Sequence, residues 1–326
     1  MEALLGRSIA AWCPRATGVV GAVRLSGGAS QETWSFDIMH PDGNIGAILR
    51  RAPPGDGASP TRAAGLDAEA TLMQLAHDAG LPSPRVMHVL TPQDELGTGF
   101  IMQRVEGETI ARKILRDAQF ARARPILARQ LGKVAAGIHS LPTSKLPKLR
   151  QMTATREIAD LERECRSFDW PRPVFELALR WLRERDLGPS DEMTLVHGDF
   201  RHGNLIIGPD GVRAVLDWEL AHLGDPMEDL GWICVNSWRF GEIDKPVGGF
   251  GSREELFAGY EFAGRRVDPD RVKFWEVMGT LRWGVMCCGM MQRFRRGPEH
   301  SVERAMIGRR SSETEIDLLR LLAPRA

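Results

Sequence analysis

Hydrophobic and polar residues alternate along the first hundred positions in short runs that predict β-strands. Two of these runs flank the turn PDGN, which predicts a hairpin. One segment instead has apolar positions at helical spacing, and Gly80 and Pro82 follow it as they follow the C-terminus of a helix. The pattern therefore predicts a small antiparallel sheet with one inserted helix. The expected strands are 19–25, 33–40, 45–51, 86–90 and 99–105, and the expected helix is 65–80.

Long helices are predicted from about residue 108 onward. Apolar residues recur at intervals of four, three and four from Leu127 to Ile138, which places them on one helix face. Ser252 and Glu255 have the spacing of a capping box at the start of another helix. The chain is therefore predicted to have an α+β fold, with a small antiparallel-sheet N-lobe (1–104) and a larger, mainly helical C-lobe (105–326). Further helices are expected at 174–188, ended by Gly188, from Asp268 and Pro269 to about Arg296, and at 299–322.

The segment 194–218 interrupts the helical half with a strand-like pattern. The apolar run TLV leads into HGDFRHGN, and two apolar strands joined by the turn GPDG follow. Antiparallel pairing brings the start of the first strand beside the end of the second. Asn204 and Asp217 are therefore expected to lie close together, next to the loop that carries Asp199. The expected strands of this hairpin are 205–207 and 213–216.

The octet HGDFRHGN admits two interpretations. Its Gly, Asp and Asn residues are ordinary turn formers, so it could be a solvated turn. Its apolar flanks favour a rigidly anchored reactive loop. Asp199 could then orient a substrate hydroxyl as a base, while Asn204 and Asp217 supply the hard oxygen ligands that Mg²⁺ prefers. The spacing of His197, Asp199 and Asn204 also matches the kinase catalytic loop H-x-D-x-x-x-x-N.

Composition argues against some classes of partner. The 326 residues carry 43 basic and 43 acidic side chains, and this balance gives no general attraction to nucleic acids or anionic membranes. The five cysteines show no metal-binding spacing, which favours reduced thiols in a cytoplasmic protein. The N-terminus lacks the pattern of a signal peptide, and no apolar run is long enough to span a bilayer. The sequence does not indicate the oligomeric state.

The segment LVHGDFRHGNLIIGPDGVRAVLDWELAHLGDPMEDLGW resembles the aminoglycoside phosphotransferase/choline kinase family, and within it the branch that is also found fused to acyl-CoA dehydrogenase modules. The segments SGGAS, ILRRAPPG and GIHSLP resemble the same branch. The resemblance implies a protein-kinase-like bilobal fold. It also implies Mg²⁺-dependent transfer of the γ-phosphoryl group of ATP or GTP to a hydroxyl group of a small metabolite.

The resemblance also implies roles for individual residues. Asp199 would be the catalytic base, His197 would organise the loop, and Arg201 would point toward the transferring phosphate. Asn204 and Asp217 would be the Mg²⁺ ligands. The implied nucleotide-binding residues are Arg50, Glu69, Ser26, Gly27, Gly28 and Met102; Arg50 replaces the usual lysine, and Glu69 is expected to pair with it.

The acceptor is less well indicated. A protein substrate is disfavoured because no long activation loop or A-P-E motif follows Asp217. Arginines of the helical half are either a solvated face or, if they face the cleft, a sign of an anionic or acyl-type acceptor. Choline would need an aromatic cage, and an aminoglycoside an acidic pocket. A non-catalytic nucleotide-binding or scaffold protein is the alternative function, suggested by Arg50. The arginines are Arg239, Arg282, Arg293, Arg295 and Arg296, and the cage candidates are Trp232, Trp238, Trp275 and Trp283.

Overall fold

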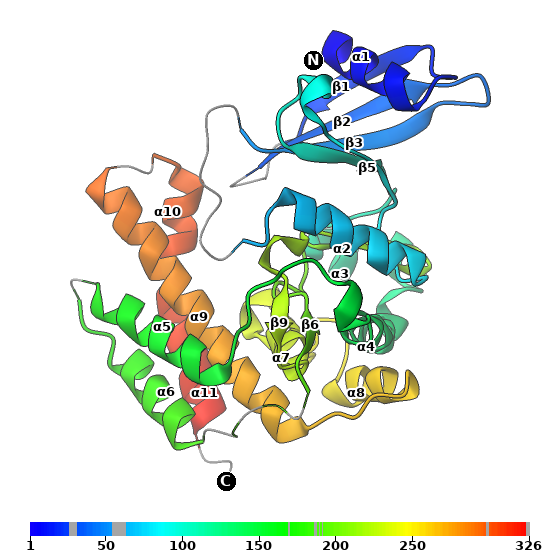
Figure 1. The fold of residues 1–326 in the computed structure, drawn as a ribbon. Coiled ribbons are helices and arrows are strands. Elements are labelled where there is room, and N and C mark those ends of the chain that lie inside the picture. The colour runs from blue at the N-terminus through cyan, green and yellow to red at the C-terminus, as the bar shows by residue number, and fades with distance from the viewer. Residues whose placement is uncertain are drawn as a thin grey trace.

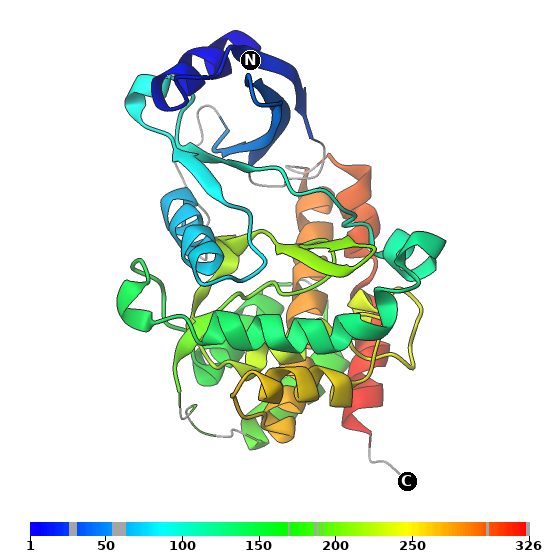
Figure 2. The same ribbon diagram turned by 90° about the vertical axis from the view of Figure 1, so that its right-hand side faces the viewer.

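The protein has the predicted α+β architecture, with a sheet at one end and a mainly helical part at the other (Figures 1 and 2). The computed structural model describes residues 1–25, 31–53, 63–168, 170–185, 188, 190, 192–297 and 300–323. The expected phosphate-loop residues Ser26, Gly27 and Gly28 lie outside the described residues.

In the described N-terminal part, five antiparallel strands form a sheet in the order β1-β2-β3-β5-β4. The predicted hairpin joins β2 to β3, with Trp34 opposite Leu49. Neighbouring residues of β3 point to opposite faces, as a pleated strand requires. Leu49 packs with helix α1, whereas Ile48 joins the core that contains helix α2. The bounds are α1 Glu2–Trp12, β1 Gly18–Arg24, β2 Glu32–Met39, β3 Ile45–Arg51, α2 Leu66–Asp78, β4 Val86–Val89 and β5 Gly99–Gln103.

The C-terminal part is built around the long helix α9 (Figure 1). The predicted caps are present: Ser252 and Glu255 form a capping box, and the Asp268 carboxylate accepts the first backbone N–H groups of α9. Helices α4 and α8 approach closely because Gly132 of α4 faces the backbone of α8. A Cβ at Gly132 would lie 2.0 Å from the Leu256 carbonyl oxygen. The helices are α3 Ala111–Arg116, α4 Arg124–His139, α5 Ala154–Arg166, α6 Pro173–Glu184, α7 Met227–Cys234, α8 Arg253–Phe262, α9 Pro269–Arg296, α10 Val302–Gly308 and α11 Ser311–Leu322.

Two of the predicted helices differ in the structure. The helix expected at 299–322 is two helices, α10 and α11, which meet at Arg309 and Arg310. The helix expected at 174–188 ends at Glu184, so Gly188 does not terminate it. Periodicity located both helical regions. The break between α10 and α11 carries no strong local signal, because Arg309 and Arg310 are good helix formers.

The predicted hairpin forms strands β7 (Leu205–Gly208) and β8 (Gly211–Val215), which lie between the sheet and the C-terminal helices (Figure 2). The strand before the octet, β6 (Thr194–Val196), pairs with a short strand that was not predicted, β9 (His222–Gly224). One continuous core contains side chains from α2, the hairpin and the C-terminal helices. The division at 104/105 remains a prediction. In the part of the chain that the structure describes, no helix has the length and apolarity needed to cross a membrane.

Candidate active site

The hairpin brings Asn204 and Asp217 together, as its pairing predicts. The backbone N–H of Leu216 donates to the Asn204 carbonyl oxygen at 2.8 Å, one residue before Asp217. Asp217 has a positive φ of 65°, a conformation that Asp tolerates better than most residues. Both side chains line a cavity of about 570 Å³ beneath the sheet. The two expected metal ligands therefore face the same space.

The loop that carries Asp199 is anchored from below by the buried carboxylate of Asp229. This carboxylate accepts the backbone N–H of His197 at 2.8 Å and that of Gly198 at 2.9 Å. His139 contacts the same carboxylate through Nε2 at 3.0 Å, and its Nδ1 lies 2.9 Å from the Tyr260 hydroxyl. A carboxylate only accepts hydrogen bonds, so Nε2 of His139 is the donor. The network fixes the backbone just before Asp199.

His197 makes a contact through each of its two ring nitrogens. Its Nε2 lies 3.0 Å from the Leu216 carbonyl oxygen, and its Nδ1 accepts the backbone N–H of Asp199 at 3.2 Å. The ring therefore bridges the octet to the end of the hairpin. It is fully buried and packs against Trp218.

Asp199 is buried, yet its carboxylate is surrounded by donors. Arg201 Nε and Trp232 Nε1 each donate to Oδ1 at 2.8 Å, and Asn204 Nδ2 donates to Oδ2 at 2.7 Å. Burial alone would raise the pKa of Asp199, but the charge of Arg201 and the Trp232 hydrogen bond lower it below its ordinary value. The group is therefore an ionised carboxylate at neutral pH.

Arg50 is the hub of a cluster of carboxylates on the other side of the cavity. Its Nε lies 3.1 Å from Glu69, which was expected to pair with it. Its Nη2 lies 2.5 Å from Asp217 and 3.4 Å from Glu219. The surrounding carboxylates raise the pKa of Arg50 above its usual range, although burial acts in the opposite direction. Arg50 thus supplies a permanent positive charge beside an expected metal ligand.

The cavity lined by Arg50, Asn204 and Asp217 combines apolar and polar side chains. Apolar side chains from the sheet, Ile48 and Met102 among them, form one wall. Arg50, Asn204 and Asp217 form the polar end. Met102, expected at the nucleotide, therefore lies in the same cavity as the polar residues. Such a combination can accommodate a base and a phosphate chain.

The donor set fits a magnesium ion. Mg²⁺ takes oxygen ligands and keeps only one or two carboxylates from the protein. Asn204 turns its amide nitrogen toward Asp199, so its amide oxygen is left for another partner. Asp217 adds a carboxylate, of which Arg50 contacts Oδ1. No group of three or more His, Cys, Asp or Glu side chains that could hold a metal ion occurs among the described residues.

Glu69 makes the stability of the protein depend on pH. Burial and the negative charges of Asp217 and Glu219 raise its pKa to about 7, and Arg50 offsets only part of this. Between about pH 4.5 and 7 the folded state therefore holds a proton that the unfolded state has lost. Folding stability from this group is full below pH 4.5 and falls as pH rises, by up to about 1.4 kcal/mol per pH unit.

Urea denaturation of the wild type and Glu69→Gln at pH 5, 6 and 7 tests this dependence. We expect the variant to gain stability relative to the wild type as pH rises. The comparison removes the contribution of His202, whose pKa burial lowers to about 4 and whose pH slope has the opposite sign. A difference in unfolding free energy that stays constant with pH would contradict the prediction.

Three site residues were not found by sequence reasoning. Glu219 contacts Arg50, Asp229 holds the loop backbone, and Trp232 donates to Asp199. All three lie in WELAHLGDPMEDLGW, which carried the family resemblance; Trp232 was considered only for a choline cage, and Glu219 and Asp229 were given no role. The helix α7, which bears Asp229 and Trp232, is buried on all sides and so has no amphipathic period to reveal it.

Two of the arginines considered for acceptor binding form ion pairs, and the four tryptophans considered for it are buried. Arg239 pairs with Glu276, and Arg282 pairs with Glu228, so neither is a solvated surface charge. Trp232, Trp238 and Trp283 form a buried cluster. Guanidinium groups already occupy ring faces in this cluster: Arg282 lies 4.1 Å from the Trp232 ring centroid and Arg201 lies 4.5 Å from that of Trp238. Trp275 is buried against Phe274.

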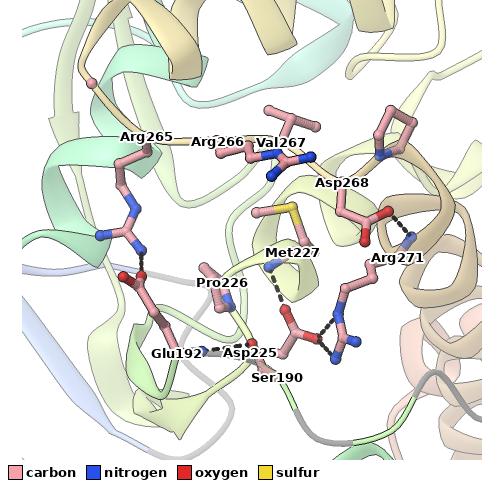
Figure 3. A pocket seen from close by; sticks show the side chains of 12 residues that line it. Ser190, Glu192, Asp225, Pro226, Met227, Arg265, Arg266, Val267, Asp268 and Arg271 are labelled. Atoms are coloured by element: carbon pink, nitrogen blue, oxygen red, sulfur yellow. Dashed lines mark hydrogen bonds and ion pairs between the residues drawn. The ribbon is translucent and has the colours of Figure 1, made fainter.

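A second cavity, of about 820 Å³, lies near the start of α7 and shares none of these site residues (Figure 3). Its charged groups are largely engaged with each other. Arg271 donates to the Asp225 carboxylate at 2.6 Å, and Arg265 pairs with Glu192. Asp225 also accepts the backbone N–H of Met227 (Figure 3). Asp225 thus connects Arg271 of α9 to Met227 at the start of α7, and none of the residues that line this cavity is an expected site residue.

A sheet-bearing lobe above a helical lobe, with a cavity between them bordered by the octet and the hairpin, defines the protein-kinase-like class of phosphotransferases. The chain belongs to the phosphotransferase enzyme family (APH), whose sequence model matches residues 21–275. The family and its structural neighbours support a phosphotransferase that acts on small molecules.

Three solved structures illustrate the shared fold. A protein from Ralstonia eutropha assigned to the aminoglycoside phosphotransferases has a TM-score of 0.72 at 22% identity, covering 97% of each chain. A choline/ethanolamine kinase family protein from Mesorhizobium loti has a TM-score of 0.66 at 20% identity, covering 98% of this chain and 94% of that one. A spectinomycin phosphotransferase, solved with ADP and spectinomycin, has a TM-score of 0.66 at 14% identity, covering 99% of each chain.

Curated relatives are longer proteins. Acyl-CoA dehydrogenase family member 10 of Mus musculus is 28% identical over 227 residues, 67% of this chain but 20% of that protein. Acyl-CoA dehydrogenase family member 11 of Rattus norvegicus is 28% identical over 248 residues, 72% of this chain and 30% of that protein. The chain thus spans a fifth to three tenths of these relatives, in agreement with the predicted resemblance to the branch fused to acyl-CoA dehydrogenase modules.

Proposed function

We propose that the protein transfers the γ-phosphoryl group of ATP or GTP to a hydroxyl group of a small molecule, with Mg²⁺ as the cofactor. The observation that carries the proposal is that Asn204, whose amide donates to Asp199, and Asp217 line the same cavity as Arg50. A base, two metal ligands and a phosphate-binding cation are the parts that phosphoryl transfer needs.

Each residue of the site would have its own role in phosphoryl transfer. Asp199 Oδ2 accepts the proton of the acceptor hydroxyl as the new P–O bond forms and the bond to the nucleoside diphosphate breaks. Arg50 and Arg201 meet the negative charge that spreads over the phosphoryl oxygens. Asn204 and Asp217 would hold the magnesium ion, which neutralises phosphate charge when bound. Met102 would lie beside the base of the nucleotide.

The acceptor that the site favours is anionic or acyl-type. Arg201 and Arg282 lie close to the Asp199 loop, where Arg201 pairs with Asp199 and Arg282 pairs with Glu228. The curated relatives are named acyl-CoA dehydrogenases, which is consistent with an acyl-type hydroxyl compound. A choline cage built from the tryptophan cluster is disfavoured, because arginines cover two of its rings.

Thermal unfolding with nucleotide tests the function directly. We expect MgATP to raise the Tm more than ATP with EDTA, because Asn204 and Asp217 contribute only when the metal is present. At a hundredfold excess over Kd, binding to the folded state adds about 2.7 kcal/mol of stability. Asp217→Asn should remove the part of the shift that depends on magnesium, and an exposed control, Asp210→Asn, should leave it unchanged.

The alternative function is a nucleotide-binding or scaffold protein without catalysis. It is favoured by the contact of Arg50 with Asp217, which occupies one oxygen of an expected metal ligand. Equal Tm shifts with and without magnesium, and no nucleoside diphosphate released with any acceptor, would support it. A screen of hydroxyacyl thioesters, hydroxy acids, choline and sugars for ATP-dependent ADP release separates the two functions and identifies the acceptor.

A further inference from the structure

The carboxylate of Asp199 is asymmetric in its contacts. Oδ1 accepts two hydrogen bonds, from Arg201 Nε and Trp232 Nε1, each at 2.8 Å. Oδ2 accepts one, from Asn204 Nδ2. A carboxylate oxygen has about two lone-pair sites, so the donors saturate Oδ1 and leave one site on Oδ2. The two donors to Oδ1 therefore decide which oxygen is available to an acceptor.

Trp232 is held in place by a cation as well as by packing. Its side chain is 3% exposed, and the Arg282 guanidinium lies 4.1 Å from its ring centroid. Arg282 is fixed in turn by Glu228 at 2.8 Å and reaches the Gly198 carbonyl oxygen, next to Asp199. A cation on the ring face draws electron density from the indole and strengthens its N–H as a donor. Packing and charge thus both direct this N–H at Oδ1.

We propose that Trp232 is a positioning residue for phosphoryl transfer: its indole N–H holds Oδ1 of Asp199, so that Oδ2 is presented to the acceptor hydroxyl. The inference rests on the proposed phosphotransferase function. Trp232 acts through Asp199 and touches neither reactant. Without Trp232, Arg201 would still donate to Oδ1 and Asn204 to Oδ2, so each oxygen would keep one open lone-pair site and neither would be singled out for the acceptor.

The tryptophan cluster supplies its own control. The indole N–H groups of Trp238 and Trp283 have no hydrogen-bond partner in the described structure, and both side chains are buried. Trp283 packs against Trp238 with ring centroids 5.0 Å apart and does not contact Asp199. Trp283→Phe therefore removes the same atoms from the same cluster as Trp232→Phe, but no bond to the carboxylate.

The first measurement needs no substrate. Protein labelled with ¹³C at the aspartate carboxyl carbons is titrated by NMR, and Asp199→Asn identifies the Asp199 signal. We expect Trp232→Phe to move the Asp199 midpoint to higher pH and Trp283→Phe to leave it unchanged, because only the first removes a bond to the ionised form. If Trp232→Phe is poorly folded, β-(3-benzothienyl)alanine at position 232 replaces the N–H by sulfur at nearly constant shape.

The second measurement is kinetic, with the acceptor found in the ADP-release screen. Trp232→Phe should lower kcat roughly tenfold or more, leave KM for MgATP unchanged, and shift the acid limb of the rate profile to higher pH. An Asp199 midpoint and a kcat both equal to those of Trp283→Phe would overturn the positioning role. A wild-type protein that phosphorylates nothing, with the midpoint shift still present, would instead overturn the proposed function.

Discussion

Asp199→Asn is expected to abolish phosphoryl transfer while leaving the fold and nucleotide binding intact. The asparagine keeps an oxygen for Trp232 and Arg201 but cannot accept a proton from the acceptor. It also turns an N–H toward Asn204, so the folded variant should be less stable than the wild type. General base catalysis contributes about a hundredfold to ten-thousandfold to such reactions, so kcat should fall on the order of a thousandfold. A coupled assay that monitors ADP release in the presence of the acceptor and MgATP measures the decrease in kcat.

Two comparisons separate this effect from unfolding. Asp210→Asn makes the same chemical change in the exposed turn between β7 and β8, and this variant should retain full turnover. The MgATP-dependent Tm shift of Asp199→Asn should match that of the wild type, because the metal ligands Asn204 and Asp217 are unchanged. Turnover near the wild-type rate in Asp199→Asn would remove Asp199 from its assigned role.

The centre of the candidate site could be read from sequence because it is local. Asp199, Asn204 and Asp217 lie within one loop and one hairpin, whose pairing follows from two apolar runs and a turn. Pairing geometry alone then places Asn204 beside Asp217. Arg50 and Glu69 were reached only through the family resemblance, since their 3.1 Å contact joins a strand to a helix and has no periodic signature.

The supporting residues could not be predicted in the same way. Asp229 acts on the backbone 31 and 32 residues earlier in the chain, and Trp232 on a side chain 33 residues earlier. Such contacts depend on how α7 packs beneath the octet, and α7 shows no polar face that would mark its orientation. A sequence pattern reports which face of an element is buried, but not which buried group meets which.

Asp229→Asn is expected to reduce both stability and activity. The carboxylate accepts three hydrogen bonds in a site with no exposure, from His197 N, Gly198 N and His139 Nε2. An asparagine would turn an N–H group toward at least one of these donors. Leaving a buried donor unpaired next to a lost charge costs about 3 kcal/mol, which urea denaturation would detect as a lower midpoint.

Loss of activity should exceed what the lower stability explains, because the two backbone N–H groups belong to the residues just before Asp199. Asp94→Asn is the matched comparison: this buried carboxylate accepts hydrogen bonds from Thr91 and contacts His88 in the N-terminal part, away from the octet. We expect Asp94→Asn to lower stability. At assay temperatures well below its Tm, it should keep the wild-type kcat. If Asp229→Asn also kept the wild-type kcat, the backbone of His197 and Gly198 would not need this anchor to position the base.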